Sequence, residues 1–215
     1  MRLITLALIT LLPLTAIAQD IDKINGNAEV GAGEHAGDIH SVNGSVRIGD
    51  GAVIQTASTV NGSVHLGENA QANALHTVNG SLDLSQGSHV TGSVKSTNGD
   101  ISLDPHADIA GSASNVNGTI TLDHAHVGAG IETATGNITV GEGSRVDGGI
   151  VVDEVNSHGW NMSSHLPHIV IGPHAIVTGM LDFRREVVLD VSDSAQIGPV
   201  HGAKVTTFHG ATPPM

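Results

Sequence analysis

The sequence contains no cysteine and no tyrosine, and it has only one tryptophan and two phenylalanines among 215 residues. The missing cysteines exclude disulfide bonds, thiolate metal sites, iron–sulfur clusters, cysteine nucleophiles and a lipidated N-terminal cysteine. Basic residues are also few, because 8 Lys and Arg stand against 21 Asp and Glu, which gives a formal net charge of −13. Nucleic-acid binding needs cationic patches and stacking rings. The composition therefore argues against a nucleic-acid partner.

The chain is rich in glycine and in apolar residues. It has 28 Gly and 39% hydrophobic residues, and only 13% of its residues are charged. Disordered chains are usually more charged and less apolar than this. We therefore expect a folded protein.

Residues 1–18 have the features of a secretory signal peptide. Arg2 precedes an apolar run over residues 3–14, and the small residues Ala16 and Ala18 match a cleavage site. The apolar run is too short to span a bilayer. We expect cleavage after Ala18 and export to the periplasm or the exterior, with no transmembrane segment in the exported chain.

An Asn-Gly pair recurs along the chain at an almost constant spacing. The glycines are 18 or 19 residues apart, and no helical pattern lies between them. The pairs are Asn25-Gly26, Asn43-Gly44, Asn61-Gly62, Asn79-Gly80, Asn98-Gly99 and Asn117-Gly118, and the reversed pair Gly136-Asn137 continues the series. A fixed period of this size is the signature of a solenoid. We expect each pair to form a corner, because Gly and, to a lesser degree, Asn tolerate positive φ.

Apolar and polar residues alternate within each repeat. Counted from the Gly as zero, even positions hold apolar or small residues, such as Ile120 and Leu122 after Gly118, whereas odd positions are polar. Successive side chains of a strand point to opposite faces, so the even positions should face a core. The sequence predicts an all-β, single-domain parallel β-helix (β-solenoid) of about nine turns with an 18–19-residue repeat over residues 19–209, followed by a disordered tail at 210–215. An antiparallel meander is the alternative, because Asn-Gly also forms hairpin turns.

Two stretches of the repeat resemble bactofilins, the polymer-forming cytoskeletal family. They are Ser144-Arg145-Val146-Asp147-Gly148-Gly149-Ile150-Val151-Val152-Asp153-Glu154 and Ile169-Val170-Ile171-Gly172-Pro173-His174-Ala175-Ile176-Val177-Thr178-Gly179. The resemblance covers residues 40–200 at the level of the pattern, and it implies a β-helix that assembles end to end without nucleotide. Typical bactofilins lie on the cytoplasmic side of the membrane, whereas this chain begins with a signal peptide. Its Val-Asn-Gly-Ser-Val units are also similar to the repeats of secreted adhesin-like β-solenoids.

About 13 extra residues interrupt the repeat at 153–166. This inserted loop contains His158, Trp160 and His165, and His168 follows it. Loops that leave a repeat often carry function. We consider three interpretations: a flap that covers the core, a partner-binding loop, and a His-based metal site, which imidazole would suit. The flap is favoured because no tight His-x-x-x-His spacing is present, and we expect no bound cofactor or metal.

Elsewhere the histidines fall at different positions of the repeat. His65, His89, His106 and His124 occupy positions three, nine, seven and six. A metal ladder needs a common column, so we interpret these residues as separate, solvated side chains. Acidic residues at positions five and six could hold calcium, but the Gly-Gly-x-Gly-x-Asp calcium repeat is absent.

The two ends of the repeat differ in sequence. The first turn has Glu34 and Asp38 where other turns have small residues, which is typical of a polar cap. The segment 203–208 forms an apolar, Thr-rich strand that could cover the last turn or pair with a second molecule. We expect Val205 and Phe208 to mediate a tail-to-tail dimer, and larger assemblies only at high salt or near pH 5.

These observations favour a structural function over a catalytic one. The sequence has no nucleophile elbow, P-loop or dinucleotide-binding fingerprint. Polysaccharide-cleaving β-helices commonly stack sugars on aromatic rings, which this chain largely lacks. We expect a non-enzymatic scaffolding protein of the cell envelope, bactofilin-like and able to assemble with itself. The alternative is a secreted adhesin-like binding module that uses the solenoid faces or the 153–166 loop.

Overall fold

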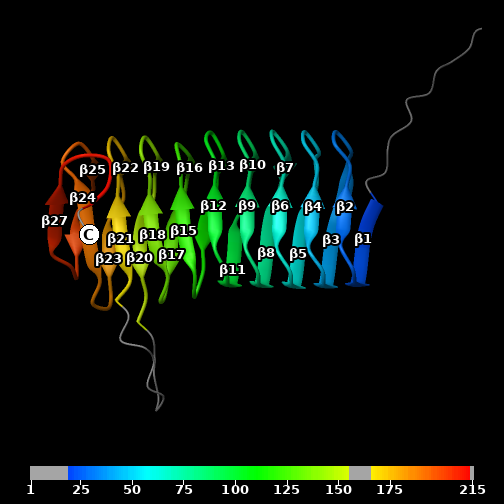
Figure 1. The fold of residues 1–215 in the computed structure, drawn as a ribbon, viewed down its shortest axis with the longest axis horizontal. Helices are drawn as coiled ribbons and strands as arrows, with labels where there is room; N and C mark the ends of the chain where they lie inside the picture. The colour runs from blue at the N-terminus through cyan, green and yellow to red at the C-terminus, as the bar shows by residue number, and fades with distance from the viewer. Residues whose placement is uncertain (1–18, 155–165, 214–215) are drawn as a thin grey trace, which may run out of the picture.

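The computed structural model describes residues 19–154 and 166–213, which form a rod of stacked turns (Figure 1). Three sheets run along the rod: sheets A and B have ten strands each, and sheet C has seven. The registers between neighbouring strands are parallel in all three sheets. The predicted all-β parallel β-solenoid is confirmed, and the antiparallel meander is wrong. The predicted signal peptide lies outside the described residues, and none of the described residues forms a helix that could cross a bilayer.

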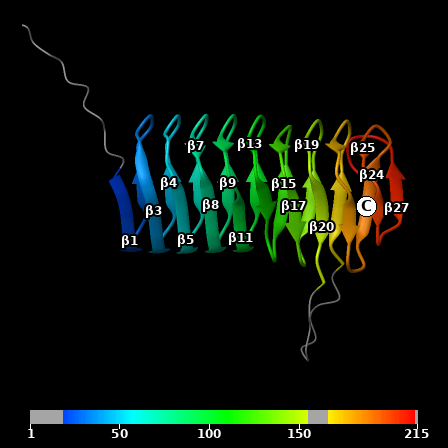
Figure 2. The same cartoon turned by 180° about the vertical axis from the view of Figure 1, so that it is seen from behind.

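Sheet A contains the longest strands, and Figure 2 shows the same stack from behind. Its strands are β1 (Gln19–Asn25), β3 (Ala36–Asn43), β5 (Thr56–Asn61), β8 (Ala74–Asn79), β11 (Val94–Asn98), β14 (Ser112–Ser114), β17 (Gly130–Thr133), β20 (Gly149–Val152), β23 (Leu181–Phe183) and β26 (Val200–His201). Sheet B consists of β2 (Ala28–Val30), β4 (Val46–Ile48), β6 (Val64–Leu66), β9 (Leu82–Leu84), β12 (Ile101–Leu103), β15 (Thr119–Leu122), β18 (Asn137–Val140), β21 (His168–Ile171), β24 (Val188–Ser192) and β27 (Val205–Phe208). Sheet C consists of the two-residue strands β7 (Gln71–Ala72), β10 (His89–Val90), β13 (Asp108–Ile109), β16 (His126–Val127), β19 (Arg145–Val146), β22 (Ile176–Val177) and β25 (Gln196–Ile197).

The stack has about ten turns, one more than the sequence pattern predicts. The additional strand of sheet B is β27, which pairs in parallel with β24. The stack is also continuous on both sides of the inserted loop, because β21 pairs with β18 and β23 pairs with β20. The insertion therefore lies in the chain between β20 of sheet A and β21 of sheet B, and neither sheet is interrupted.

The even positions two, four, eight and ten are buried in most turns, as the alternation predicts, whereas position six is exposed in most of them. Ile120 is fully buried, and its in-register partners Ile101 and Ile138 are fully buried as well. Position fourteen is an exception, because in the 18-residue turns the buried residue stands at thirteen, as Ala57 and Leu75 do. Turns of 19 residues have their additional residue between the strands of sheets C and A. Every later position in these turns is therefore one higher than in the 18-residue turns.

The positive φ that the sequence suggests for the Asn-Gly corners is present at Gly26, Gly80 and Gly118, but the other three corners require glycine for a different reason. No positive φ is found at Gly44, Gly62 or Gly99, although other corner glycines have one. A Cβ on Gly99 would overlap the carbonyl oxygen of Gly80 in the preceding turn, and the other stacked corners are crowded in the same way. Close approach of successive turns, rather than backbone conformation, therefore excludes larger residues here.

The corner asparagines form a hydrogen-bonded ladder along the rod. The side-chain N–H of Asn61 donates to Oδ1 of Asn43 at 3.0 Å, and Asn79 donates to Asn61 in the same way. The ladder runs through Asn25, Asn43, Asn61, Asn79, Asn98 and Asn117. Thr135 donates to Asn117 at the end of the ladder, just before the pair reverses to Gly136-Asn137.

A second row of polar side chains lies inside each corner. Thr59 is 2% exposed and donates its hydroxyl to the carbonyl oxygen of Gly44 at 2.8 Å, and Thr77 donates to Gly62 at 2.9 Å. A buried polar group is costly unless it is hydrogen-bonded. These hydroxyl groups are therefore satisfied by the carbonyl groups that point inward from the glycine corners.

Candidate functional site

The structure places only one of the four residues predicted around the inserted loop. His158, Trp160 and His165 lie outside the described residues. His168 is the first residue of β21, and its Nε2 lies 2.7 Å from Oδ2 of Asp190 in the next turn. Within residues 19–154 and 166–213, no group of three or more His, Asp or Glu side chains is arranged to hold a metal ion. A function of the loop itself stays a prediction.

Some of the histidines share columns, so the interpretation of scattered side chains is wrong for His89, His106 and His124, whereas His65 has no histidine beside it in its row. His106 and His124 occupy equivalent positions in adjacent turns, with φ values of 65° and 47°, and the N–H of His106 donates to the carbonyl of His124. His89 and His126 both pair in register with Asp108, which lies between them. The sequence contains the missing signal. The repeat unit that begins at Gly118 has one residue fewer between Leu122 and His124 than the preceding unit has at the same place. Each later position of this unit must therefore be counted one higher.

A network of five side chains crosses the outer face of sheet C. The two oxygens of Asp108 lie 2.6 Å from Nδ1 of His89 and 2.5 Å from Nδ1 of His126. Nε2 of His126 lies 3.0 Å from Asp147, which also pairs with Arg145 at 2.6 Å. Both ring nitrogens of His126 thus contact carboxylates. An imidazole can donate from both nitrogens only in its protonated form.

The surroundings of His126 favour its charged form. Burial disfavours the imidazolium, but the hydrogen bonds to Asp108 and Asp147 outweigh it and raise the pKa of His126. The hydrogen bonds from His126 and Arg145 lower the pKa of Asp147. The network therefore links four consecutive turns through His126 and favours the charged form of its ring.

We expect replacement of His126 by glutamine to reduce stability more at pH 5.5 than at pH 8. A raised folded-state pKa contributes stability that is fully present below the unfolded-state pKa and is lost as pH rises through the folded value. The side chain is 36% exposed, so solvent screening limits the difference to about 0.5 kcal/mol. Urea unfolding of both proteins at the two pH values measures it. An equal loss of unfolding free energy at both pH values would show that His126 is not protonated in the folded protein.

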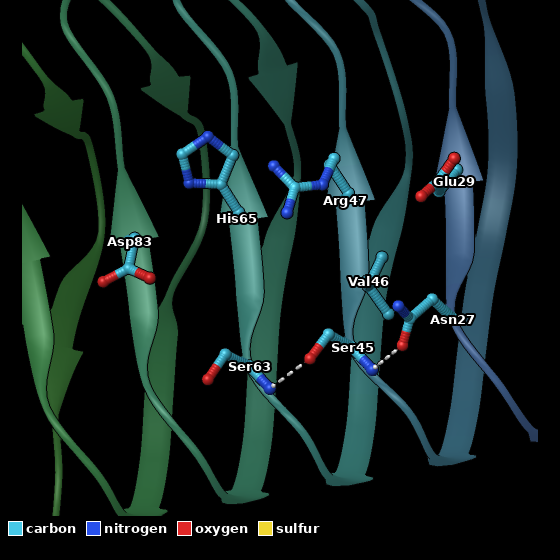
Figure 3. A pocket seen from close by; sticks show the side chains of 8 residues that line it. All are labelled: Asn27, Glu29, Ser45, Val46, Arg47, Ser63, His65 and Asp83. Atoms are coloured by element: carbon cyan, nitrogen blue, oxygen red, sulfur yellow. Dashed lines mark hydrogen bonds between the residues drawn. The ribbon is translucent and has the colours of Figure 1, made fainter.

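A shallow hollow of about 180 Å³ lies on sheet B near the start of the rod (Figure 3). Its outward side chains belong to one in-register row, Glu29, Arg47, His65 and Asp83. Partial burial raises the pKa of Asp83, while nearby His65 acts in the opposite direction. The hollow therefore presents a row of mixed charge that a polar ligand could contact.

A larger hollow of about 320 Å³ lies over the middle of sheet A, beside the place where the inserted loop leaves the rod. Ser114 separates Lys95 from Glu132 in one outward row, and its short side chain leaves the gap. A hydrogen bond to Asp153, together with burial, raises the pKa of Glu132. Asp153 also pairs with Arg184 at 2.5 Å. The hollow is polar and combines charges of both signs.

The two ends of the rod lie far apart and have strands at their edges, β1 and β2 at one end and β26 and β27 at the other (Figures 1 and 2). Glu34, predicted as part of a polar cap, is exposed and accepts a hydrogen bond from the N–H of Gly31. The N–H of Asp38 donates to Asp20 of β1. Glu34 therefore bonds within its own turn, whereas Asp38 bonds to the neighbouring strand β1, which is the outermost strand of sheet A.

The two residues predicted to mediate assembly have different environments. Phe208 is 3% exposed, and its carbonyl accepts a hydrogen bond from the N–H of Asp193. Val205 is 37% exposed at the end of the rod. Phe208 is therefore buried in the last turn, and of the two residues only Val205 has side-chain surface available to a second molecule.

The register of each sheet matches one end of the rod to the other. In sheet A, the inward column begins at Ile21 and ends at Val200. In sheet B, the corresponding column begins at Ala28 and ends at Val205. A second copy placed head to tail would continue both columns in the same parallel register.

Backbone groups at the two edges are also complementary. The N–H of Ala28 and the carbonyl of Val30 bond toward the interior of sheet B, and alternate residues of a strand direct these groups to opposite sides. Glu29 therefore directs its N–H and carbonyl outward at the first edge. By the same alternation, Val205 and Thr207 direct theirs outward at the last edge. The outward groups of the two edges stand in the pattern that joins neighbouring turns within the rod.

No protein-family model, curated protein or solved structure matches this chain. The fold is therefore established by the parallel registers between strands in all three sheets. The likeness to bactofilins and to adhesin-like solenoids rests on the sequence pattern alone.

Proposed function

We propose that the chain is an exported, non-enzymatic scaffolding protein of the cell envelope that assembles end to end. The observation that carries the proposal is the match between the two ends of the rod. The inward columns that end at Val200 and Val205 are the columns that begin at Ile21 and Ala28. A head-to-tail contact of this kind is heterologous, so it generates an open filament.

Two further observations support the proposal. Cleavage after Ala18 would make Gln19 the first residue, and Gln19 is also the first residue of β1. The exported chain would thus begin with a strand at the edge of sheet A. Unprotected strand edges are sites where another chain can pair. The bactofilin-like pattern of residues 138–154 and 169–183 agrees with a polymer-forming function.

The alternative function is that of an adhesin-like binding module. The row of mixed charge in Figure 3 and the polar hollow near Asp153 favour it, because both present polar groups to a ligand. A binding module would stay monomeric in solution.

Proline substitutions at the two edges test end-to-end assembly. Glu29→Pro removes an outward N–H from the first edge, and Thr207→Pro removes one from the last edge. In the chain that begins at Gln19, each variant alone should stop assembly. A mixture of the two should form dimers, because each protein keeps one intact end. Sedimentation velocity distinguishes monomers, dimers and longer species.

Glu29→Ala is the matched control, because it removes the same side chain but keeps the backbone donor. Tail-to-tail pairing through Val205 would give a different result, namely that Glu29→Pro dimerises by itself. Monomers in every sample and at every pH would contradict self-assembly and favour the binding module.

A further inference from the structure

The Asp108–His126–Asp147 arrangement shows how this fold accommodates an imidazole between two carboxylates of different turns. Nδ1 of His126 contacts Asp108 on one side, and Nε2 contacts Asp147 on the other. Both contacts need the protonated ring. The arrangement is stable only when the histidine is charged.

One of these two contacts, between Nδ1 of a histidine and a carboxylate of the preceding turn, is also present at the end of sheet A. Nδ1 of His201 lies 2.9 Å from Oδ1 of Asp182, and the histidine side chain is 75% exposed. Asp182 also accepts a hydrogen bond from Arg184, and these bonds from His201 and Arg184 lower the pKa of Asp182. Asp182 therefore remains ionised and holds Nδ1 of His201.

His201 is the last residue of an outward row on sheet A, and Asp22 is the first. The row runs through Asp22, His40, Ser58, His76, Lys95, Ser114, Glu132, Val151, Asp182 and His201. A second copy stacked head to tail in the same register would place its Asp22 next to His201. The junction would then contain Asp182, His201 and Asp22 in three successive turns, as Asp108, His126 and Asp147 are, although Asp147 stands two residues beyond Arg145, the in-register partner of His126.

We infer that protonated His201 bridges Asp182 and Asp22 of a second copy of this chain, and that this contact makes head-to-tail assembly dependent on pH. The inference rests on the proposed end-to-end assembly. A neutral His201 that donates Nδ1–H to Asp182 has only a lone pair on Nε2, which would face the carboxylate of Asp22. Protonation replaces that repulsion with a charge-assisted hydrogen bond.

Other charges near the junction agree with a contact between these two ends. The first end carries the acids Asp20, Asp22, Glu29 and Glu34 and the base Lys23, whereas the last end carries His201, Lys204 and His209. The acids at the last end already have partners, because Asp182 pairs with His201 and Asp193 pairs with His209. The charged groups that face His201 in the stacked pair are Asp182 on β23, Arg184 just after β23, Lys204 after β26, and Asp20, Asp22 and Lys23 on β1 of the second copy.

The self-association constant, measured by sedimentation equilibrium between pH 5.5 and 7.5, tests the inference. Because assembly takes up about one proton, the Kd of the chain from Gln19 should fall about tenfold as pH falls over this range. His201→Asn and Asp22→Asn should each leave association nearly independent of pH. His168→Asn is the control, because His168 forms a similar pair with Asp190 but lies on sheet B, away from the ends. It should keep the full pH dependence.

The outcomes separate this inference from the function on which it rests. If His201→Asn assembles with an unchanged pH dependence, the histidine bridge is wrong and end-to-end assembly stands. If no variant and no pH gives association, both are wrong.

Discussion

Replacing Ile120 by aspartate will lower the free energy of unfolding by about 5 kcal/mol, whereas the same change at Thr121 will alter it by less than about 0.5 kcal/mol. Ile120 is fully buried in the middle of sheet B, between Ile101 and Ile138 of the adjacent turns. An aspartate there loses the apolar contacts and buries a charge without a partner. Thr121 points outward between Ser102 and Thr139, so a carboxylate at this position stays hydrated and meets no like charge in its row.

Chemical unfolding followed by circular dichroism compares the two variants directly. Thr121→Asp is the matched control, since it places the same side chain one residue away on the same strand. Equal losses for the two variants would contradict the assignment of even positions to the core.

Gly99→Ala will destabilise the rod by about 3 kcal/mol, because the added Cβ meets a backbone carbonyl and not a flexible side chain. Its backbone shows no positive φ, so the cost comes from the stacked turn alone. Gly51→Ala is the contrasting change, since Gly51 has a φ of 65° and no atom within 4 Å of the added Cβ. Its cost should be about 1 kcal/mol, which is the conformational penalty by itself.

The two glycine variants distinguish the two explanations of the repeated Asn-Gly corner. Close approach between turns predicts a larger loss of stability at Gly99, whereas a need for positive φ predicts a larger loss at Gly51. Thermal and urea unfolding of both variants measure the order. A smaller loss at Gly99 than at Gly51 would contradict the account based on close approach.

Features that depend on a single turn could be predicted from the sequence. The alternation around Ile120 and Leu122 predicts the buried face correctly, because the direction of a side chain in a strand depends only on its local position. The fold class follows from the same periodicity. Features that depend on contacts between turns were harder to predict. The Asn61–Asn43 hydrogen bond and the crowding at Gly99 exist only after the turns are stacked.

Columns of charged residues can be predicted only after turns of unequal length have been aligned. The pairing of His89 and His126 with Asp108 becomes visible in the sequence only when the shorter unit at Gly118 is corrected by one residue. The ends pose a different difficulty. Phe208 resembles an exposed residue of a terminal strand, but its strand adds a further turn and the residue is buried there. Sequence periodicity does not show where the stacking ends.

Electron microscopy of the chain from Gln19 at pH 5.5 tests end-to-end assembly most directly. Ten strands in each of sheets A and B, at a spacing of about 4.8 Å, predict unbranched filaments of constant width with an axial subunit repeat of roughly 48 Å. Discrete particles no longer than two rods, at every concentration, would contradict continuation of the stack from one copy to the next.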